Sequence, residues 1–332
     1  MNPKVSIIVP IHNAGNYLKP CLDSLICQTL QDIEIILVLD LPTDGSDVIA
    51  EQYAQRDNRI KIIRNQANLH IGFSRNEGLK IATGEYIGFC DHDDYCEITM
   101  YETLYNQAIT DNSEIVVCDF WLKSPTELTH YGFPKKLTNN EFREKSLEAL
   151  IVGLRSKGNT DSFDNVNNVW NQIFKTDFIA KNNILFDDNR ISTYEDSVFN
   201  IKTYSVAQSV SYVPQNLYYH ITTGINSFNS YGYYSLSKIL THFEIIIQYL
   251  DRQRLLDKNI ELLSKNILSR LYTSFRNELK FNGLKSIIPF IISARKHEKT
   301  QNILSIMSSN KTLLSSFSIT KKIFFFLITY GK

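Results

Sequence analysis

Three short apolar runs, each followed by a segment long enough for a helix, constrain the fold more than any other feature of this sequence. The runs are rich in β-branched residues and cover residues 5–9, 33–39 and 60–63. Such runs are typical of buried strands, whereas the segments 17–29 and 46–53 between them are expected to be helices. Alternation of strand and helix predicts parallel strands joined by crossover helices. The N-terminal part is therefore expected to form an α/β fold.

A fourth apolar run, over residues 86–90, follows an expected helix at 73–82 and leads directly into an acidic cluster at residues 91–94. The cluster reads Asp-His-Asp-Asp. In open α/β sheets, ligands bind at the carboxyl ends of the strands. The polar turn that starts at Asp40 follows the second strand and lies at the same expected edge. The two turns together form the predicted site.

Later segments extend this domain and then change character. A polar stretch from 123 to 140 is expected to be a loop or a small hairpin. Glu195 and Asp196 open a further helical run, where carboxylates favour the helix N-terminus. Toward the C-terminus the apolar spacing becomes helical, with lysine and arginine between the apolar positions. We predict an α/β domain over residues 1–228 and a C-terminal helical region over residues 229–332.

Charge and composition exclude several classes of protein. The 35 basic and 35 acidic side chains give a formal net charge of zero, so no long-range field would attract nucleic acid. The N-terminal apolar run is too short for a signal peptide, and no window reaches the roughly 18 apolar residues that span a bilayer. These observations predict a cytoplasmic protein. The five cysteines are odd in number and lack CxxC spacing, which predicts reduced, structural thiols.

Asp91 and Asp93 are spaced so that both could grip a hard divalent cation that also binds phosphate oxygens. Two other interpretations stay open from these residues alone. The acidic residues could only solvate a turn or cap the next helix. Asp91 could also be the nucleophile of a haloacid-dehalogenase-type phosphatase, with Asp93 as its acid/base. That phosphatase motif normally begins its domain, whereas three expected strands precede it here, which favours the metal-binding interpretation over the phosphatase.

Several ordered motifs give the sequence a resemblance to a known family. They are Val5 to Ala14 with Tyr17-Leu18 and Gln28-Thr29, Asn68 to Gly84, Asp91 to Asp94, Val169-Trp170-Asn171, Glu195-Asp196, and Leu217 to His220 with Asn226-Ser227. In this order they resemble glycosyltransferase family 2, an inverting family with the GT-A fold. The resemblance covers roughly residues 4 to 228, and the ordered set is far more specific than any one motif. It implies a Rossmann-like mixed sheet flanked by helices.

The resemblance implies a donor-binding role for six matching residues. Pro10 and Asn13 would shape the nucleotide pocket, and Asp40 would face the nucleobase or the ribose. Asp91 would contact ribose or phosphate. Arg75 would contact the diphosphate or the sugar, since its planar fork suits phosphate. His92 is counted with these donor-binding residues and not with the metal ligands.

The family also implies a metal ligand and a general base. Asp93 would bind the metal, Mn²⁺ or Mg²⁺, and Asp196 would deprotonate the acceptor hydroxyl as it attacks the anomeric carbon. A single displacement inverts the anomeric configuration. His220 could reach the diphosphate or the metal, although a histidine beside two tyrosines is more often packed or solvated. The further candidates for the site are therefore Glu195, Trp170 and His220.

The implied activity is the transfer of a hexosyl or N-acetylhexosaminyl group from a nucleotide-diphosphate donor. UDP-sugars are the favoured donors, and the acceptor is a saccharide or a lipid-linked saccharide in surface polysaccharide biosynthesis. A non-catalytic nucleotide- or saccharide-binding protein on the same fold is the alternative, and the presence of Asp93 and Asp196 argues against it. The apolar tail over residues 321–330 follows two lysines. It would either pack on the domain or lie in the membrane interface.

The sequence departs from the family pattern at three positions. Leu39 and Leu41 stand where family members usually have an aspartate and a glycine after the second strand. The nucleobase contact is therefore expected to differ from the usual one. Gln172 stands where a basic residue is common after Trp-Asn, which leaves an acceptor or phosphate contact there in doubt.

Overall fold

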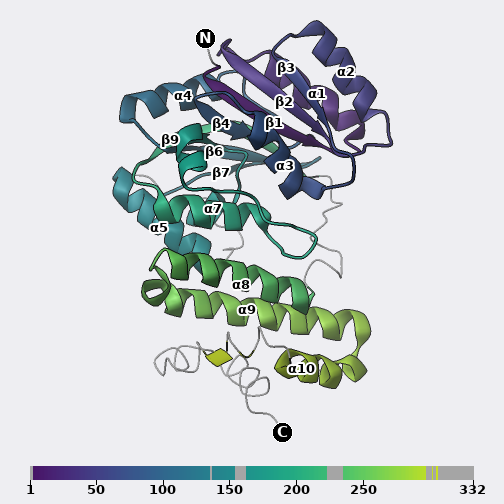
Figure 1. Ribbon diagram of the computed structural model, residues 1–332, viewed down its shortest axis with the longest axis vertical. Coiled ribbons are helices and arrows are strands. Elements are labelled where there is room, and N and C mark those ends of the chain that lie inside the picture. Colours follow the sequence, from purple (N-terminus) through teal and green to yellow (C-terminus); the bar gives the residue numbers. More distant parts are fainter. Residues whose placement is uncertain are drawn as a thin grey trace. The chain divides into compact units, whose positions relative to one another are not determined.

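One mixed sheet organises the N-terminal part of the protein. The computed structural model describes residues 3–134, 137–153, 162–222 and 235–296, together with residues 301, 304 and 305. Within these residues, nine strands lie in the order β3-β2-β1-β4-β8-β6-β9-β5, and β7 pairs with β6 (Figure 1). The strands are β1 (Val5–Ile11), β2 (Ile33–Leu39), β3 (Ile60–Arg64), β4 (Tyr86–Phe89), β5 (Tyr95–Cys96), β6 (Ile115–Lys123), β7 (Leu128–Tyr131), β8 (Gln172–Lys175) and β9 (Val210–Ile221).

Helices follow the strands in the alternation that the sequence predicts. The helices are α1 (Leu18–Ile26), α2 (Ser46–Arg56), α3 (His70–Ile81), α4 (Met100–Asp111), α5 (Asn139–Val152), α6 (Thr176–Lys181), α7 (Glu195–Val206), α8 (Leu236–Arg252), α9 (Leu256–Asn282) and α10 (Ile287–Lys296), with short 3₁₀ turns η1 (Gly15–Tyr17), η2 (Phe163–Asn167) and η5 (Leu284–Ser286). Strands β3, β2, β1 and β4 are mutually parallel, as crossover helices require. Beyond β4 the sheet becomes mixed, because β8 pairs antiparallel with both β4 and β6.

Strand β1 is buried on both faces of the sheet, which explains its continuous apolar sequence. Its alternate residues Val5, Ile7 and Val9 belong to a core that also contains residues of α1 and α4. Ile8 points to the opposite face, toward α3. A Cβ atom added to Gly78 of α3 would lie 2.5 Å from Ile8 Cγ2. Glycine at this position therefore lets α3 pack directly on β1.

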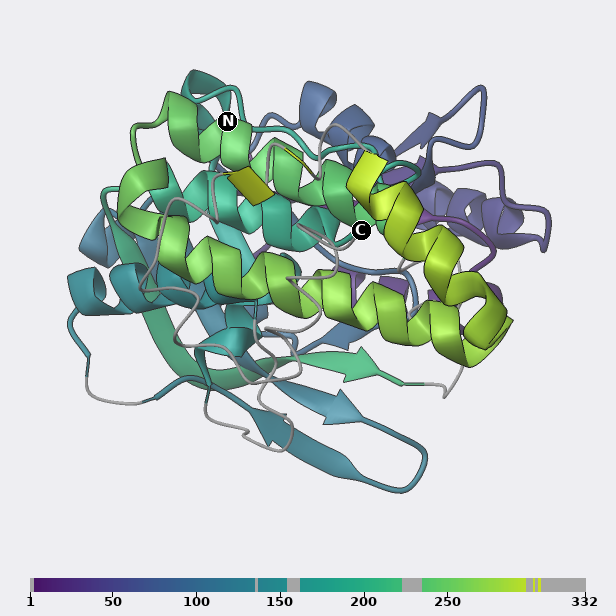
Figure 2. The same cartoon turned by 90° about the horizontal axis from the view of Figure 1, so that it is seen from below.

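The chain divides into two units, and each is built from more than one segment. Unit 1 comprises Met1–Leu147, Arg155–Asp188 and Glu195–Ile225, and contains the sheet. Unit 2 comprises Glu148–Leu154, Asn189–Tyr194 and Asn226–Lys332, and contains α8, α9 and α10 (Figures 1 and 2). The predicted boundary between residues 228 and 229 lies outside the described residues. The position of that boundary stays a prediction.

Helices α8 and α9 of unit 2 pack against each other through apolar faces. The buried side chains include Ile239, Phe243 and Ile246 of α8, and Ile267 and Leu271 of α9. The expected helical C-terminal region is thus present. Among the described residues, no helix combines the length and the apolar character that crossing a bilayer requires.

Several elements differ from or refine the expectations. The stretch from 123 to 140, expected to be a loop or a small hairpin, contains the second strand of the β6–β7 hairpin and the start of α5. Strand β8 was not expected from the sequence, and its four residues lie between β4 and β6 in the sheet. All five cysteines are free, and four are buried, in agreement with reduced structural thiols.

Candidate active site

A buried arginine lies at the centre of the predicted site. The side chain of Arg75, on α3, is 0% exposed. Its Nη2 donates to Asp91 Oδ1 at 2.8 Å, and its Nη1 donates to Asp196 Oδ1. Glu195 Oε1 lies 3.5 Å from the same Nη1. One guanidinium therefore joins the end of β4, which precedes Asp91, to the first turn of α7.

Close packing of α3 brings this arginine between the other elements. A Cβ atom at Gly72 would lie 2.7 Å from the carbonyl oxygen of Asp187. Aromatic rings surround the guanidinium carbon, which lies 5.9 Å from the ring centre of Phe89 and 5.2 Å from that of Phe186. Rings at such distances attract a desolvated cation. Carboxylates and aromatic rings thus stabilise the positive charge of Arg75, which has no direct contact with bulk water.

The charges that meet here alter the pKa values of Arg75 and Asp196. Burial alone would lower the pKa of Arg75, but Asp196, Asp91 and Glu195 outweigh burial and raise it. Burial, followed by repulsion from Glu195 and Asp91, raises the pKa of Asp196 despite the attraction of Arg75. Three carboxylates share one cation, so Asp196 holds a proton more readily than an ordinary aspartate. The side chain of Asp196 keeps 22% of its surface exposed.

A second charged pair lies at the end of β9. The carboxylate of Asp94 is buried and accepts hydrogen bonds from Tyr218 Oη at 2.9 Å and from the Ile221 amide at 2.7 Å. His220 Nδ1 lies 3.0 Å from Asp94 Oδ2. Burial lowers the pKa of His220, but Asp94 outweighs it and raises the pKa to about 9. This shift favours the imidazolium form of His220, whose ring stacks on Trp170 with 5.3 Å between ring centres.

Asp93 differs from Asp91 and Asp94, because within the described residues its carboxylate is not paired with another residue. Among the described residues, no other residue donates a hydrogen bond to its carboxylate or forms an ion pair with it. Burial first, and the charge of Asp91 second, raise the pKa of Asp93. A half-buried carboxylate beside a second carboxylate, with no cation of its own, fits a bound divalent cation. No group of three or more His, Cys, Asp or Glu side chains in the described part of the chain is arranged to hold a metal by itself.

The side chain of Asp40 is buried and points into the protein. Its carboxylate accepts hydrogen bonds from Asn65 Nδ2 at 2.8 Å and from the backbone amides of Leu69 and His70 at 2.7 and 2.8 Å. These contacts hold the turn that leads into α3. Leu41, which stands where the family has glycine, adopts φ 52° and exposes 46% of its surface. The turn thus keeps a left-handed backbone without glycine.

The other donor-site candidates lie around the same strand ends. Pro10 is in β1, and its carbonyl oxygen lies 3.0 Å from His92 Nδ1. Asn13 has φ 51°, and its side-chain oxygen accepts a hydrogen bond from the Thr43 amide at 2.7 Å. This bond ties the turn after β1 to the turn after β2. The roles of these residues in donor binding stay predictions.

Gln172 lies inside the sheet. It is fully buried on β8, and its Oε1 accepts a hydrogen bond from Tyr204 Oη at 2.9 Å. Its side chain therefore packs between sheet and helix. An acceptor or phosphate contact, left in doubt by the sequence at this position, is not supported by this geometry.

Comparison with known proteins identifies the family. The sequence model of the family described as "Glycosyl transferase family 2" matches residues 6–200. The chain belongs to glycosyltransferase family 2. The resemblance found in the sequence is confirmed, and the phosphatase interpretation of Asp91 falls with it.

Curated relatives of this family-2 glycosyltransferase include two bacterial glycosyltransferases. It is 38% identical to glycosyltransferase EpsJ of Bacillus subtilis (strain 168) over 218 residues, which cover 66% of this chain and 61% of EpsJ. It is 30% identical to glycosyltransferase YibD of Escherichia coli (strain K12) over 287 residues, which cover 85% of this chain and 78% of YibD. The chain thus matches less than two thirds of the length of EpsJ.

Solved structures confirm the GT-A fold. Residues 1–349 of S. aureus TarS, in complex with UDP-GlcNAc, superpose with a TM-score of 0.67 at 20% identity, covering 98% of this chain and 89% of that one. At this identity the likeness shows the fold alone. Asp94 and Asn65 contribute contacts to the site but had no predicted role. Asp94 belongs to the acidic cluster, but its partners Tyr218, His220 and Ile221 lie on β9, far away in the sequence. Asn65 donates to Asp40 and to Ser74 of α3, and no local pattern indicates these contacts.

Proposed function

We propose that this family-2 glycosyltransferase moves a sugar from a nucleotide diphosphate to a saccharide acceptor with inversion, using Asp196 as the general base. The meeting of Asp91 and Asp196 on one buried guanidinium carries this proposal. The proposed donor-side carboxylate and the proposed base are thereby held at one place, although they belong to different segments. A base beside the bound donor is what a single displacement needs.

Asp196 is proposed to act as a base near neutral pH, and its surroundings support this role. Its raised pKa favours proton uptake from the acceptor hydroxyl as that oxygen attacks the anomeric carbon. Arg75 donates a hydrogen bond to one carboxylate oxygen of Asp196 and thereby fixes the orientation of that carboxylate. The exposed part of the side chain leaves access for an acceptor. Glu195 would keep the local charge negative and thereby support the raised pKa.

Asp93 would hold the metal, Mn²⁺ or Mg²⁺, and the donor diphosphate would complete its ligands. Such a cation neutralises charge on a diphosphate leaving group. Hard divalent cations bind through carboxylate oxygens and phosphates in this manner. The imidazolium of His220, held by Asp94, would add a second positive charge on the diphosphate side. The mannosyltransferase PcManGT from Pyrobaculum calidifontis, a fold neighbour, is described in complex with GDP-Man and Mn²⁺.

UDP-sugars are the favoured donors, since a fold neighbour is described in complex with UDP-GlcNAc. The contacts of Asp40 with Asn65 and two backbone amides imply that it shapes the base pocket through the turn it holds. The proposed acceptor is a saccharide or lipid-linked saccharide of surface polysaccharide biosynthesis, at the cytoplasmic side. One curated relative is a poly(ribitol-phosphate) beta-glucosyltransferase of Bacillus spizizenii, 30% identical over 221 residues. The tail over residues 321–330 lies outside the described residues.

The first test is calorimetric titration of UDP, GDP, CDP and dTDP in Mn²⁺ and then in EDTA. We expect metal-dependent binding of one nucleotide, UDP, and the loss of that binding in Asp93→Ala. Binding of none of the four by a folded sample would contradict the proposal and favour a non-catalytic protein.

The second test separates binding from transfer. Asp196→Asn is expected to bind the nucleotide as the unmodified protein does and to lose about 10²- to 10⁴-fold in transfer. The matched control is Asp187→Asn, since Asp187 pairs with Lys202 and not with Arg75. Undiminished transfer by Asp196→Asn would remove Asp196 as the base. Analysis of the anomeric configuration of the product tests inversion.

A further inference from the structure

Helix α10 exposes apolar side chains on the side opposite to its packing face. Phe290 and Ala294 are buried, and the Phe290 ring lies 6.0 Å from the Phe275 ring of α9. Ile288 and Ile292, one turn apart, are 70% and 44% exposed. At 100° per residue, they face away from Phe290 and Ala294. A helix that is apolar on both sides is expected inside a core or at a membrane.

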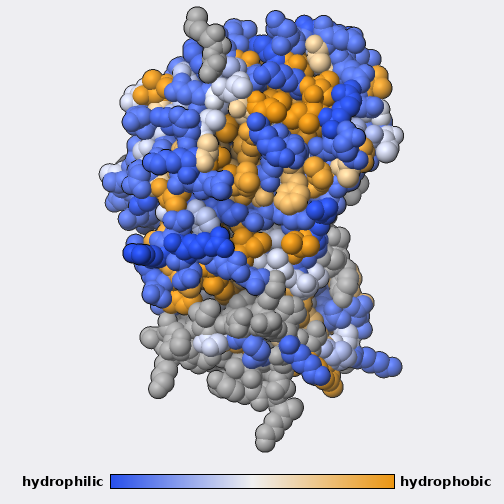
Figure 3. Space-filling view, viewed as in Figure 1, coloured by the Kyte–Doolittle hydropathy of each residue, from blue (hydrophilic) through white to orange (hydrophobic). Residues whose placement is uncertain are grey.

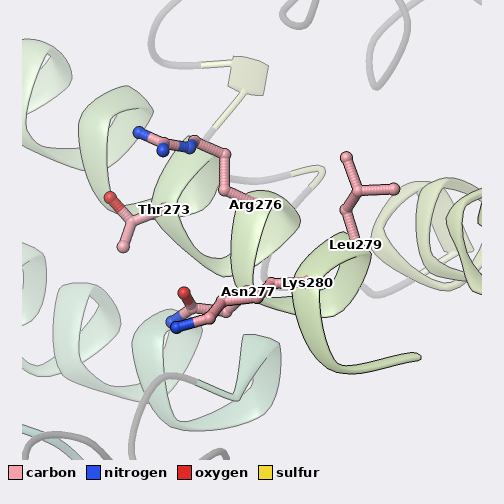
Figure 4. A pocket seen from close by; sticks show the side chains of 5 residues that line it. All are labelled: Thr273, Arg276, Asn277, Leu279 and Lys280. Atoms are coloured by element: carbon pink, nitrogen blue, oxygen red, sulfur yellow. The ribbon is translucent and has the colours of Figure 1, made fainter. Parts of the chain in front are cut away.

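Exposed cations lie on α10, on η5 before it and on α9, against which α10 packs. Arg276 and Lys280 of α9, Lys285 of η5 and Lys296 at the end of α10 are exposed. In the described part of the chain, none of the four forms an ion pair with an acidic side chain. Arg276 and Lys280 line a hollow of about 490 Å³ together with Thr273, Asn277 and Leu279 (Figure 4). Figure 3 shows hydrophobic and strongly hydrophilic side chains side by side where α10 lies in Figure 1.

The net charge of the chain is zero, but basic and acidic side chains are distributed unequally along the sequence. Residues 235–332 contain 16 lysines and arginines but only 6 aspartates and glutamates. Residues 1–234 contain 19 and 29, respectively. The C-terminal region is therefore basic by ten charges, and the α/β region is acidic by the same amount. A basic region attached to an acidic one would orient the protein at an anionic surface.

We propose that the surface formed by Ile288, Ile292, Arg276, Lys280 and Lys285, here called the α10 surface, binds a bilayer that contains anionic lipids. The isoleucines would enter the interface between headgroups and acyl chains, and the cations would contact lipid phosphates. An anionic polymer would satisfy the cations and leave the exposed isoleucines in water. The combination of both features favours the bilayer. This surface goes beyond the proposed transferase activity and does not depend on it.

The test is flotation of the full-length protein with phosphatidylcholine vesicles, with and without phosphatidylglycerol. We expect binding to the anionic vesicles only, weakened by added NaCl. Each of Lys280→Gln and Lys285→Gln should reduce binding about fivefold. The double variant Ile288→Ser with Ile292→Ser should reduce it about tenfold or more, with an unchanged circular dichroism spectrum.

The matched control removes two positive charges from unit 1. Lys4→Gln combined with Lys80→Gln removes as many positive charges as Lys280→Gln combined with Lys285→Gln, and it should float as the unmodified protein does. Equal binding to neutral and anionic vesicles would overturn the proposal. So would full vesicle binding by the isoleucine variant together with displacement by polyphosphate, which would identify an anionic polymer site. Nucleotide titration of the same variants is expected to be unchanged, so failure of the α10 surface is distinguishable from failure of the proposed transferase activity.

Discussion

Arg270 of α9 donates a hydrogen bond from Nη1 to the hydroxyl of Tyr194 at 2.5 Å, and its guanidinium carbon lies 4.3 Å from the centre of the Tyr194 ring. Its Nη2 donates to the Gly153 carbonyl at 2.9 Å. Tyr194 has φ 56°, a left-handed backbone that a non-glycine residue adopts at a cost. Arg270 therefore attaches two short segments of the chain to the helices of unit 2.

Replacing Arg270 by methionine should destabilise unit 2. The substitution keeps most of the apolar stem but removes three charge-assisted hydrogen bonds, to Tyr194, Gly153 and Asn266, and a cation–π contact. We expect a loss of about 2–4 kcal/mol in the free energy of unfolding, measured by urea titration. Arg276→Met, on the same helix but exposed, is the control and should change this energy little. Equal effects of the two variants would show that the Tyr194 contact contributes nothing.

Arg75→Lys should be far more destabilising than its conservative appearance suggests. Lysine presents a compact point charge and cannot bridge Asp91 and Asp196 with a planar fork. Arg75 itself is fully buried, and disrupting its bridge to these partly buried carboxylates should cost about 3–5 kcal/mol, seen as a lower melting temperature. The control is Arg64→Lys, whose partner Glu51 is half exposed, and there the change should be small. A melting temperature of Arg75→Lys close to that of the control would contradict the central role of the guanidinium.

The first four strands could be predicted because their pattern is local. The run from Ile33 to Leu39 contains only one charged residue, and β2 has those same bounds. Strand β8 could not be predicted in this way, because its four residues become a strand only through pairing with β4 and β6. Pairing between distant segments decides such short elements, and local propensity does not.

The candidate site likewise combines features that could be predicted from the sequence with features that could not. Asp91 and Asp196 were expected to act in one reaction, and the structure brings them to one guanidinium. The contact of His220 with Asp94 joins residues 126 positions apart, and no sequence spacing indicates it. The burial of Asp40 against the turn before α3 could not be predicted either. The sequence shows that an aspartate follows the strand, but it does not show whether the side chain points into the protein or toward a ligand.

Gly78→Ala should test whether α3 must lie directly on β1. The new methyl group would lie 2.5 Å from Ile8 Cγ2, so helix and strand would have to separate. We expect a loss of about 1–3 kcal/mol from overpacking, measured by thermal unfolding. Ile8→Ala removes the clashing atom but itself costs about 2–5 kcal/mol because Ile8 is fully buried. Gly78→Ala should therefore cost less in the Ile8→Ala background than in the unmodified protein. Lys80→Ala, on the exposed side of α3, is the control. An equal cost of Gly78→Ala in both backgrounds would place the strain elsewhere.

The pH dependence of stability should depend on His242 of α8. Burial first, and the charge of Arg270 second, lower the pKa of His242 to about 3, and its Nδ1 donates to the Thr193 carbonyl at 2.7 Å. The unfolded chain binds this proton near pH 6.5, and the folded chain does not. The unfolded state therefore gains protons first as the pH falls. The stability contribution of His242 is complete above about pH 6.5 and is lost progressively toward pH 3.

The variant His242→Gln keeps a donor for Thr193 but cannot be protonated. Between pH 8 and pH 5, the unmodified protein should lose about 2 kcal/mol more stability than the variant, which corresponds to 1.5 pH units below the unfolded pKa. Urea titrations of both proteins at the two pH values measure this difference. His130→Gln, in unit 1 and only partly buried, is the matched control and should leave the pH dependence unchanged. If His242→Gln loses as much stability on acidification as the unmodified protein, then His242 takes up its proton without unfolding of unit 2, and the buried environment described for it would be wrong.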